Sequence, residues 1–519
     1  MKKKVLGLMM GVLAAMPAFV SADEVGNETF KECVTSAETK TCTLTENVTV
    51  EEQLEISGTI VLDLNGYSIT PAETTEIAGG LLNVLHGGTL TIEDAKGTGK
   101  ITVGDNTNVM SPLQLTKSGK TDVTKTATLI VNGGHLEGNS FAICGNGNPD
   151  RINTKVIING GKLSIKSKTG AAIYQPQDGE TIINGGEITG ATGIEIRSGK
   201  LEVNGGKIVG TEVPVTVTPN GNGTTSTGAG IAVAQHTTKL PIEIIINGGT
   251  IQGYSALYQS NPQNNAAEDI AKIKITVKGG SLEAINDGTQ VIYSENNLIT
   301  VEAGEFNGEL SEDITTPEGT EVYEVITTEG EVKYVVAEEE AVEEGYFGLG
   351  FTEEGFEEVF DSQEDYEEVK GLIDETLEKK YTAAIYYEIV YGGLLNGNLV
   401  NDESLAKTEL EEAVEVTLDI PETLDKVKEG FTRKYVVIRV HYNEETQEYE
   451  TDVLPATEKD GKVTFETDKF STYVLAYEDT KVTENPKTFD GISLYMIIAA
   501  TSLMGLVSLV VYSKKAKNY

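Results

Sequence analysis

Residue types that could carry out hydrolysis or elimination are present in this chain, but they are scattered along it. A hydrolase needs two carboxylates at a suitable separation, and a calcium-dependent lyase needs acidic ligands together with a basic residue that takes the proton. Asp63 and Asp94 are isolated carboxylates typical of turns or solvated surface, and neither Arg151 nor Arg197 is flanked by a pair of aspartates. Tryptophan, the usual platform for stacking sugars, is absent. We therefore expect no catalytic residues, no metal site and no cofactor.

The cysteines indicate a structural role. Cys33 and Cys42 lie nine positions apart in "FKECVTSAETKTCTL", close enough to pair around a short loop, and we favour a disulfide between them. Cys144 is then left over. A lone cysteine in a strand, with no histidine near it in the sequence, indicates a small packing residue rather than a nucleophile.

The N-terminal residues predict export. "MKKKVLGLMMGVLAAMPAFVSADEV" combines three lysines, an uncharged run and a small-x-small site, which predicts a signal peptide over residues 1–22 that is cleaved after Ala22. The alternative is an uncleaved membrane anchor. With 81 acidic against 40 basic residues, the chain is not expected to bind nucleic acid or anionic membrane surfaces. Its length of 519 residues predicts at least two folded parts.

A short pattern recurs between residues 64 and 306: a large apolar residue, Asn-Gly-Gly or a variant of it, one further residue and a second large apolar residue. Its copies are "LNGYSI", "LHGGTL", "VNGGHL", "INGGKL", "INGGEI", "VNGGKI", "INGGTI", "VKGGSL" and "VEAGEF". The repeat predicts a parallel β-helix, because no single coil could bury its apolar face alone. The long intervals from His86 to Asn132 and from Asn204 to Asn247 indicate either double coils or coils with long loops.

The Asn-Gly pairs are expected to form the corners between strands, since both residues tolerate the left-handed backbone of a sharp bend. The corner asparagines should also stack along the solenoid and share amide hydrogen bonds, which is a structural role. They are Asn65, Asn132, Asn159, Asn184, Asn204 and Asn247.

A second recurrent strand supplies a candidate ligand face. If Ile143, Ile173, Ile194, Ile231, Leu257 and Ile292 point inward, alternation turns the next residue of each strand outward. The outward residues are then Cys144, Tyr174, Glu195, Ala232, Tyr258 and Tyr293. Flat rings beside amide donors could stack on sugars, and the candidate residues are Tyr174, Gln175, Tyr258, Gln259 and Tyr293. The alternative is that these tyrosines simply favour strands.

The composition changes after residue 310. Residues 311–378 contain 24 acidic and only two basic residues, which indicates a solubilising surface. The alternative is divalent-cation binding, which the lack of a spaced calcium loop disfavours. Within this segment, "EVYEVITTEGEVKYVV" predicts a hairpin at Glu329-Gly330 that could cap the solenoid, and "SQEDYEEVKGLIDETLEKK" predicts an exposed helix. We expect an acidic hairpin and linker over 311–360, followed over 361–480 by this helix and a β-sandwich-like spacer domain.

The opening "TIVLDLNGYSIT" and the corners that follow resemble the right-handed β-helix surface proteins of Gram-positive bacteria, whose fold is shared with pectate-lyase-like enzymes. The resemblance covers residues 43–310. It implies an all-β chain with a right-handed parallel β-helix over 23–310 and a smaller β-sandwich-like domain after it. The ending "VTFETDKFSTYVLAYED" is similar to the closing strands of membrane-proximal modules in bacterial surface proteins.

The C-terminal residues 481–519 combine a Pro-x-Thr peptide, an apolar run from Ile492 to Tyr512 and the basic tail "SKKAKNY". An apolar run of this length predicts a transmembrane segment whose positive tail stays in the cytoplasm. The layout resembles the cell-wall sorting signal that sortases recognise, with Asn and Phe where the usual motif has Leu and Gly. The motif residues would be Asn485, Pro486, Lys487, Thr488 and Phe489. The alternative is a single-span anchor that is never cut.

Together these features predict a non-catalytic surface protein that displays a β-helix for adhesion or interaction. A sortase would attack the Thr488 carbonyl and transfer the protein to peptidoglycan, leaving it extracellular and wall-anchored. Membrane contact would occur only through the C-terminal segment before processing, and the ligand would be a glycan or a host surface. The alternative is a surface polysaccharide lyase or glycoside hydrolase on the same scaffold.

Overall fold

The computed structural model describes residues 22–482, except 117–121, 216–227, 289, 358, 361, 378–379, 422–423, 425–426 and 444–445. The chain forms two compact units. Unit 1 runs to Phe347 and takes in Gly392–Ala406, whereas unit 2 comprises Gly348–Tyr391 and continues from Lys407. The boundaries that we expected after residues 310 and 360 therefore differ from the division in the structure. Most of the predicted linker belongs to the solenoid unit.

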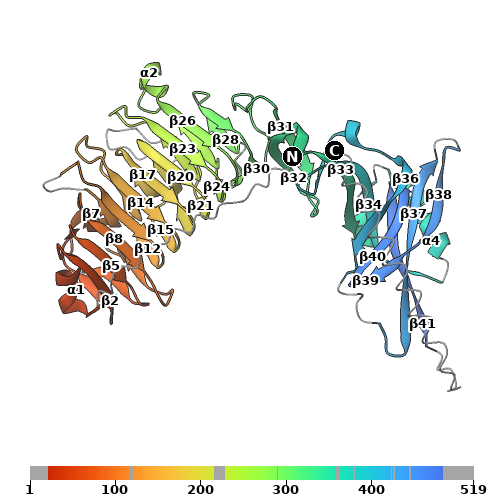
Figure 1. Cartoon of the computed structure of the whole chain (residues 1–519), viewed down its shortest axis with the longest axis horizontal. Helices are drawn as coiled ribbons and strands as arrows, with labels where there is room; N and C mark the ends of the chain where they lie inside the picture. The colour runs from red at the N-terminus through yellow and green to blue at the C-terminus, as the bar shows by residue number, and fades with distance from the viewer. Residues whose placement is uncertain are drawn as a thin grey trace, which may run out of the picture. The chain divides into compact units, whose positions relative to one another are not determined.

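Unit 1 is a β-helix-like solenoid of three parallel sheets, which we call sheets A, B and C (Figure 1). Each complete coil contributes one strand to each sheet, in that order, whereas the first strand of sheet A and the final strands of sheets A and B belong to incomplete coils. Sheet A contains β1 (Asp23–Val25), β2 (Thr39–Leu44), β5 (Thr59–Asp63), β8 (Thr89–Glu93), β11 (Ala127–Val131), β14 (Thr154–Ile158), β17 (Gly179–Ile183), β20 (Gly199–Val203), β23 (Ile242–Ile246), β26 (Ile273–Val277) and β29 (Ile299–Val301).

The other two sheets have the same coil order. Sheet B contains β3 (Val48–Val50), β6 (Ser68–Pro71), β9 (Lys100–Thr102), β12 (His135–Gly138), β15 (Lys162–Ile165), β18 (Glu187–Gly190), β21 (Lys207–Gly210), β24 (Thr250–Gly253), β27 (Ser281–Ala284) and β30 (Gly304–Phe306). Sheet C contains β4 (Leu54–Ile56), β7 (Ile77–Val84), β10 (Val109–Leu115), β13 (Ile143–Cys144), β16 (Ala171–Gln175), β19 (Thr192–Ile196), β22 (Ile231–Ala234), β25 (Leu257–Ser260) and β28 (Ile292–Ser294).

The apolar residues on either side of each predicted corner form the core. In the two successive coils that begin with β11 and β14, Val131 and Leu136 lie beside Ile158 and Leu163, and all four are 0% exposed. Stacking like residues at every rung produces one continuous core. The interval from Asn204 to Asn247 is a single coil with a long loop, because β20 pairs directly with β23. β8 likewise pairs directly with β11, so the interval from His86 to Asn132 contains one long coil together with β11, the first strand of the next coil.

The amide ladder forms, although with fewer members than expected. Asn159 donates its side-chain N–H to Asn132 Oδ1 at 2.8 Å, and the same bond joins Asn184 to Asn159, Asn204 to Asn184 and Asn247 to Asn204. Asn65 instead donates to Leu44 O. The ladder stops short of Asn65 because the intervening coil has Glu93 in that register, and Asn132 donates to Glu93.

Two expectations about the corners were wrong. The segment "LHGGTL" joins β7 of sheet C to β8 of sheet A, whereas the other copies join sheet A to sheet B. Among the corner asparagines only Asn65 has a left-handed backbone, with φ 46°. In the coils that form the ladder, the second glycine of the corner has the left-handed backbone instead, as at Gly186 with φ 86°. The asparagine side chain can therefore stack on the asparagines of the adjacent coils.

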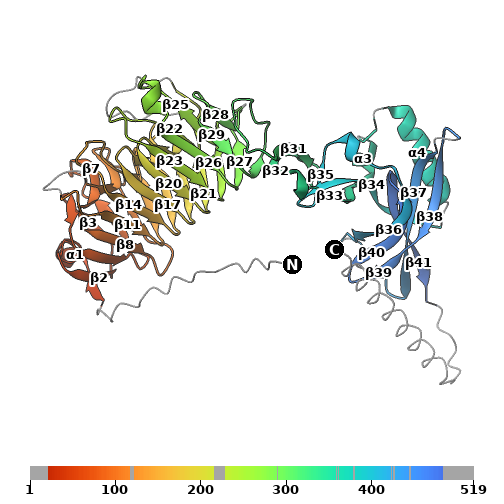
Figure 2. The same cartoon turned by 45° about the horizontal axis from the view of Figure 1, so that its top comes forward.

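Both ends of the solenoid are covered by local structure. Helix α1 (Asn27–Val34) lies at the end where the chain begins (Figures 1 and 2) and buries Phe30 and Val34 against the first coils. At the other end β31 (Thr320–Ile326) and β32 (Val332–Glu338) form the predicted hairpin, and β32 pairs antiparallel with β30. Tyr334 of this hairpin packs against the core. The short helix α2 (Ala267–Ile270) lies in the loop between β25 and β26.

Unit 2 contains two antiparallel sheets and the helices α3 (Glu353–Glu357) and α4 (Gln363–Leu377). One sheet has the order β34 (Thr382–Leu395), β41 (Thr472–Lys481), β37 (Phe431–Asn443) and β38 (Glu448–Pro455). The other contains β36 (Glu409–Asp419), β40 (Lys462–Lys469) and β39 (Thr457–Lys459). β33 (Glu343–Phe351) spans the boundary at Phe347, whereas β35 (Asn398–Val400) and the 3-10 turns Glu339–Ala341 and Glu403–Leu405 belong to unit 1.

Helix α4 is not the exposed helix that its charges suggested. It contacts β37 and β38, as Figure 2 shows, and buries Val369 and Ile373 beside Ile438 and Val440. The acidic side chains occupy the other side of the helix. A single apolar stripe was enough to dock it on the sheet.

Candidate interaction faces

The predicted outward row of sheet C exists as a register. Parallel pairing aligns Cys144 with Tyr174, Tyr174 with Glu195 and, farther along, Tyr258 with Tyr293. The row is mostly covered, however. Tyr174 is 7% exposed and Glu195 is 0% exposed. An outward direction on the strand therefore does not make these side chains accessible, because side chains from neighbouring coils and loops lie over them.

Tyr174 belongs to a small apolar cluster on this face. Its ring stacks on Phe141 with the ring centroids 5.0 Å apart, and Cys144 completes the cluster. Burial raises the pKa of the Tyr174 phenol. Tyr174 is thus a packing residue, and it lies three strands away from Tyr258, roughly 14 Å at the usual strand spacing.

Tyr258 and Tyr293 are partly exposed, but their rings do not lie flat on the sheet. The centroids are 4.7 Å apart and the ring planes differ by 16°. This separation equals the spacing between adjacent strands, so each ring covers a face of the other and the pair turns its edges outward. The expected strip of ring faces for sugar stacking is therefore absent from this pair.

Gln175 and Gln259 point into the solenoid, contrary to the prediction that they offer amides to a ligand. Gln175 is 3% exposed, donates to Ser198 O and accepts from the Thr181 hydroxyl. Gln259 is 0% exposed and donates to Asn296 Oδ1. The reason is strand alternation: a residue next to an outward tyrosine has to point inward.

Sheet B carries a basic row that the repeat pattern did not reveal. Lys100 aligns with His135, and His135 aligns with Lys162, on the outward side of three consecutive strands. The next residue of each strand, Ile101, Leu136 or Leu163, is 0% exposed and fixes this orientation. A running count of charge along the sequence would have located these residues, because basic side chains outnumber acidic ones only in this part of the solenoid.

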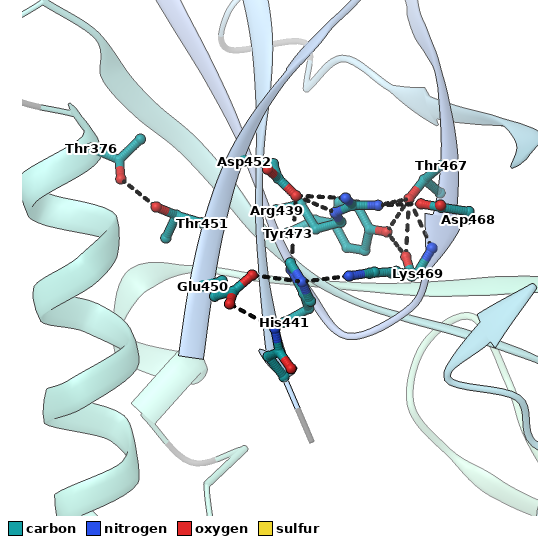
Figure 3. Close-up of polar contacts among 11 residues, drawn as sticks. Thr376, Arg439, His441, Glu450, Thr451, Asp452, Thr467, Asp468, Lys469 and Tyr473 are labelled. Atoms are coloured by element: carbon teal, nitrogen blue, oxygen red, sulfur yellow. Dashed lines mark hydrogen bonds and ion pairs between the residues drawn. The ribbon is translucent and has the colours of Figure 1, made fainter. Parts of the chain in front are cut away.

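A densely connected polar cluster lies in unit 2, between its two sheets (Figure 3). Arg439 is 8% exposed and donates to Asp452 Oδ2 from two of its nitrogens and to Asp468 Oδ1 at 2.8 Å. It also donates to the Thr467 hydroxyl, which contacts the Tyr473 phenol at 2.8 Å. The Arg439 side chain lowers the pKa of Asp468. These pairs tie β37 to β38 and β40, which is a structural role that only the tertiary structure reveals.

The predicted disulfide is present in the structure, joining Cys33 of α1 to Cys42 of β2. Cys144 is buried and is not part of a disulfide. In the described ranges between Ala22 and Val482, no group of three or more His, Cys, Asp or Glu side chains could hold a metal ion. Within those same ranges, none of the helices is long and apolar enough to cross a membrane.

The sorting-motif residues Asn485, Pro486, Lys487, Thr488 and Phe489 lie outside the described residues, as do the apolar run after them and the signal peptide before Ala22. Comparison with known proteins finds no family model, curated relative or solved structure that matches the chain. The functional argument therefore depends on the residues themselves.

Proposed function

We propose that the protein is a non-catalytic bacterial surface protein that displays the solenoid of unit 1 for adhesion or interaction and is attached to the cell wall at Thr488. The observation that carries this proposal is the construction of the solenoid. Its core is continuous, its corner amides bond to one another and both of its ends are covered. Such a body is a rigid scaffold that needs no ligand to hold its shape.

The position of the first strand supports export. Strand β1 begins at Asp23, immediately after the expected cleavage site at Ala22, and pairs with β2. Removal of the signal peptide would leave this edge strand complete. The disulfide between Cys33 and Cys42 is likewise typical of a protein that folds outside the cytoplasm.

Wall attachment is tested by mass spectrometry of fragments released by wall digestion. We expect a C-terminal peptide that ends at Thr488 and carries a wall-derived amine, with residues 489–519 absent. Changing Thr488→Ala should remove this product and leave the protein in the membrane fraction. Recovery of the unaltered protein with residues 489–519 intact in the membrane fraction would instead support a plain single-span anchor.

The competing function is a polysaccharide lyase or glycoside hydrolase on the same solenoid. A reducing-end assay and an unsaturated-product assay against a panel of glycans separate the two functions. We expect no turnover. Reproducible turnover that is lost when one solenoid carboxylate is changed to its amide would overturn the non-catalytic proposal.

A further inference from the structure

Charge is distributed unevenly along the solenoid. Residues 23–94 contain 14 acidic and two basic residues, and residues 169–310 contain 15 acidic and seven basic residues. Between them, residues 95–168 contain ten basic and only four acidic residues. The solenoid of a chain with a net charge of −41 thus carries one positive segment, flanked by negative ones on both sides.

The fold gathers part of this segment onto one face. Lys100, His135 and Lys162 begin three adjacent strands of sheet B and are in register. At the usual strand spacing, Lys100 and Lys162 lie about 10 Å apart. Lys168 is exposed in the turn that follows β15. We call Lys100, His135, Lys162 and Lys168 the basic belt; β12 and β15, which carry its centre, are labelled side by side in Figure 1.

The lysines of the belt have few ion-pair partners among the described residues. Lys162 has one ion pair, with Glu187 at 3.6 Å, and both side chains are about half-exposed. Across the part of the chain that the structure describes, Lys100 and Lys168 have no carboxylate within ion-pair distance. By contrast, Lys166 of the same turn is already held by Gly104 O and by Asp105. The belt can therefore offer ammonium groups to an external anion.

His135 adds a polar group between the two lysines. One ring nitrogen lies 2.7 Å from the Ser164 hydroxyl. Burial lowers the pKa of His135, and the positive charges of Lys162 and Lys100 act in the same direction against the opposing effect of Glu137. The ring is therefore neutral at neutral pH and contributes hydrogen bonding, while the lysines contribute the charge.

We propose that the basic belt binds a linear anionic polysaccharide that lies across β9, β12 and β15. The acidic segments on both sides restrict the favourable stretch to these coils. A nucleic acid duplex, with one charge per about 1.7 Å of axis, would extend over the flanking acidic coils and be repelled by them. A flexible chain with widely spaced carboxylates or sulfates can place its charges on the belt alone.

The inference names a partner class for the proposed display function and is independent of how the protein is anchored. If the belt fails to bind while Thr488 is still processed, only this inference is lost. If processing fails while the belt still binds, only the anchoring proposal is lost.

The test uses the full chain and immobilised polygalacturonate, with dextran sulfate as the sulfated probe and neutral dextran as the uncharged control. Binding should occur to both anionic polymers and weaken steeply as salt is added. The double variant Lys100→Gln, Lys168→Gln should weaken binding about tenfold at low salt. The matched control Lys274→Gln, Lys278→Gln makes the same change in net charge on sheet A and its corner, and should leave affinity nearly unchanged.

Three outcomes would overturn the inference. One is equal loss of affinity in the two double variants with unchanged melting temperatures, since binding would then reflect overall charge. The second is the absence of binding to either anionic polymer. The third is binding of duplex DNA as tightly as of the polysaccharides.

Discussion

Lys469 Nζ lies 2.9 Å from His441 Nε2 in the polar cluster of unit 2 (Figure 3). An ammonium group can only donate, so Nε2 accepts and the proton of the neutral ring is on Nδ1. His441 Nδ1 in turn lies 3.8 Å from Asp452 Oδ2. Lys469 and His441 therefore form a hydrogen bond that exists only while His441 is uncharged.

This contact predicts a loss of stability in mild acid. Burial lowers the pKa of His441, and Lys469 and Arg439 lower it further, against the opposing effects of Asp452 and Glu450. As the pH falls below about 6.5, the pKa of histidine in the unfolded chain, His441 becomes protonated in the unfolded state but stays neutral in the folded state. The free energy of unfolding of unit 2 should therefore fall with pH in this window.

The variant His441→Gln should flatten that dependence, because glutamine does not titrate. The measurement is hydrogen exchange of peptides from β37 and β38 in the full chain at a series of pH values, with peptides from unit 1 as the internal reference. Parallel pH profiles for the two proteins would show that His441 does not contribute.

Glu388 of β34 should produce a dependence of opposite sign. Burial raises the pKa of its carboxyl from 4.5 to about 7, although the Thr472 hydroxyl partly stabilises the charged form. The contribution of protonated Glu388 to the free energy of unfolding is fully present below the unfolded-state pKa of 4.5. It is lost as the pH rises through about 7. Because the side chain keeps some access to solvent, we expect Glu388→Gln to stabilise unit 2 by only about 1–2 kcal/mol well above that pH.

Below the unfolded-state pKa the gain from Glu388→Gln should vanish, and urea unfolding monitored by tyrosine fluorescence at the two pH extremes measures the difference. Glu415→Gln, at an exposed position on β36, is the matched control. A gain of the same size at both extremes would rule out titration of Glu388 as its cause.

In the amide ladder, we expect the middle asparagines to contribute most to the free energy of unfolding of unit 1. Asn184 donates to Asn159 at 2.8 Å and accepts from Asn204 at 3.0 Å, so Asn184→Ala removes two hydrogen bonds. At about 1 kcal/mol for each bond, the cost should be roughly 2 kcal/mol. Asn247→Ala, at the end of the ladder, removes only the bond to Asn204 and should cost about half as much. Equal melting temperatures for the two variants would contradict a ladder contribution.

The disulfide predicts a local effect at the start of the solenoid. Cys33 and Cys42 are separated by nine residues, and a loop of that size is worth about 2–3 kcal/mol through the entropy of the unfolded chain. The double variant Cys33→Ser, Cys42→Ser should loosen α1 and increase hydrogen exchange around Phe30. Exchange in the later coils should not change. Cys144→Ser, which removes a buried thiol elsewhere, serves as the control.

Features that repeat locally could be predicted from the sequence. Inward stacking of residues such as Val131 and Ile158 follows from strand alternation combined with a coil-length repeat, and these residues are fully buried. The hairpin at Glu329-Gly330 was identifiable because its two strands are adjacent in the chain and its turn residue, Gly330, has φ 80°. Each of these signals lies within a few residues.

Other features depend on which segments lie next to each other across coils, and only the tertiary structure decided them. Tyr174 faces outward as strand alternation predicts, yet Phe141, from the loop between β12 and β13 in the preceding coil, covers it. Lys100 and Lys162, 62 positions apart, form one row because two coils of unequal length bring them into register. Strand direction is set by neighbours in the chain, whereas exposure and alignment are set by loops and registers whose partners are distant in the sequence.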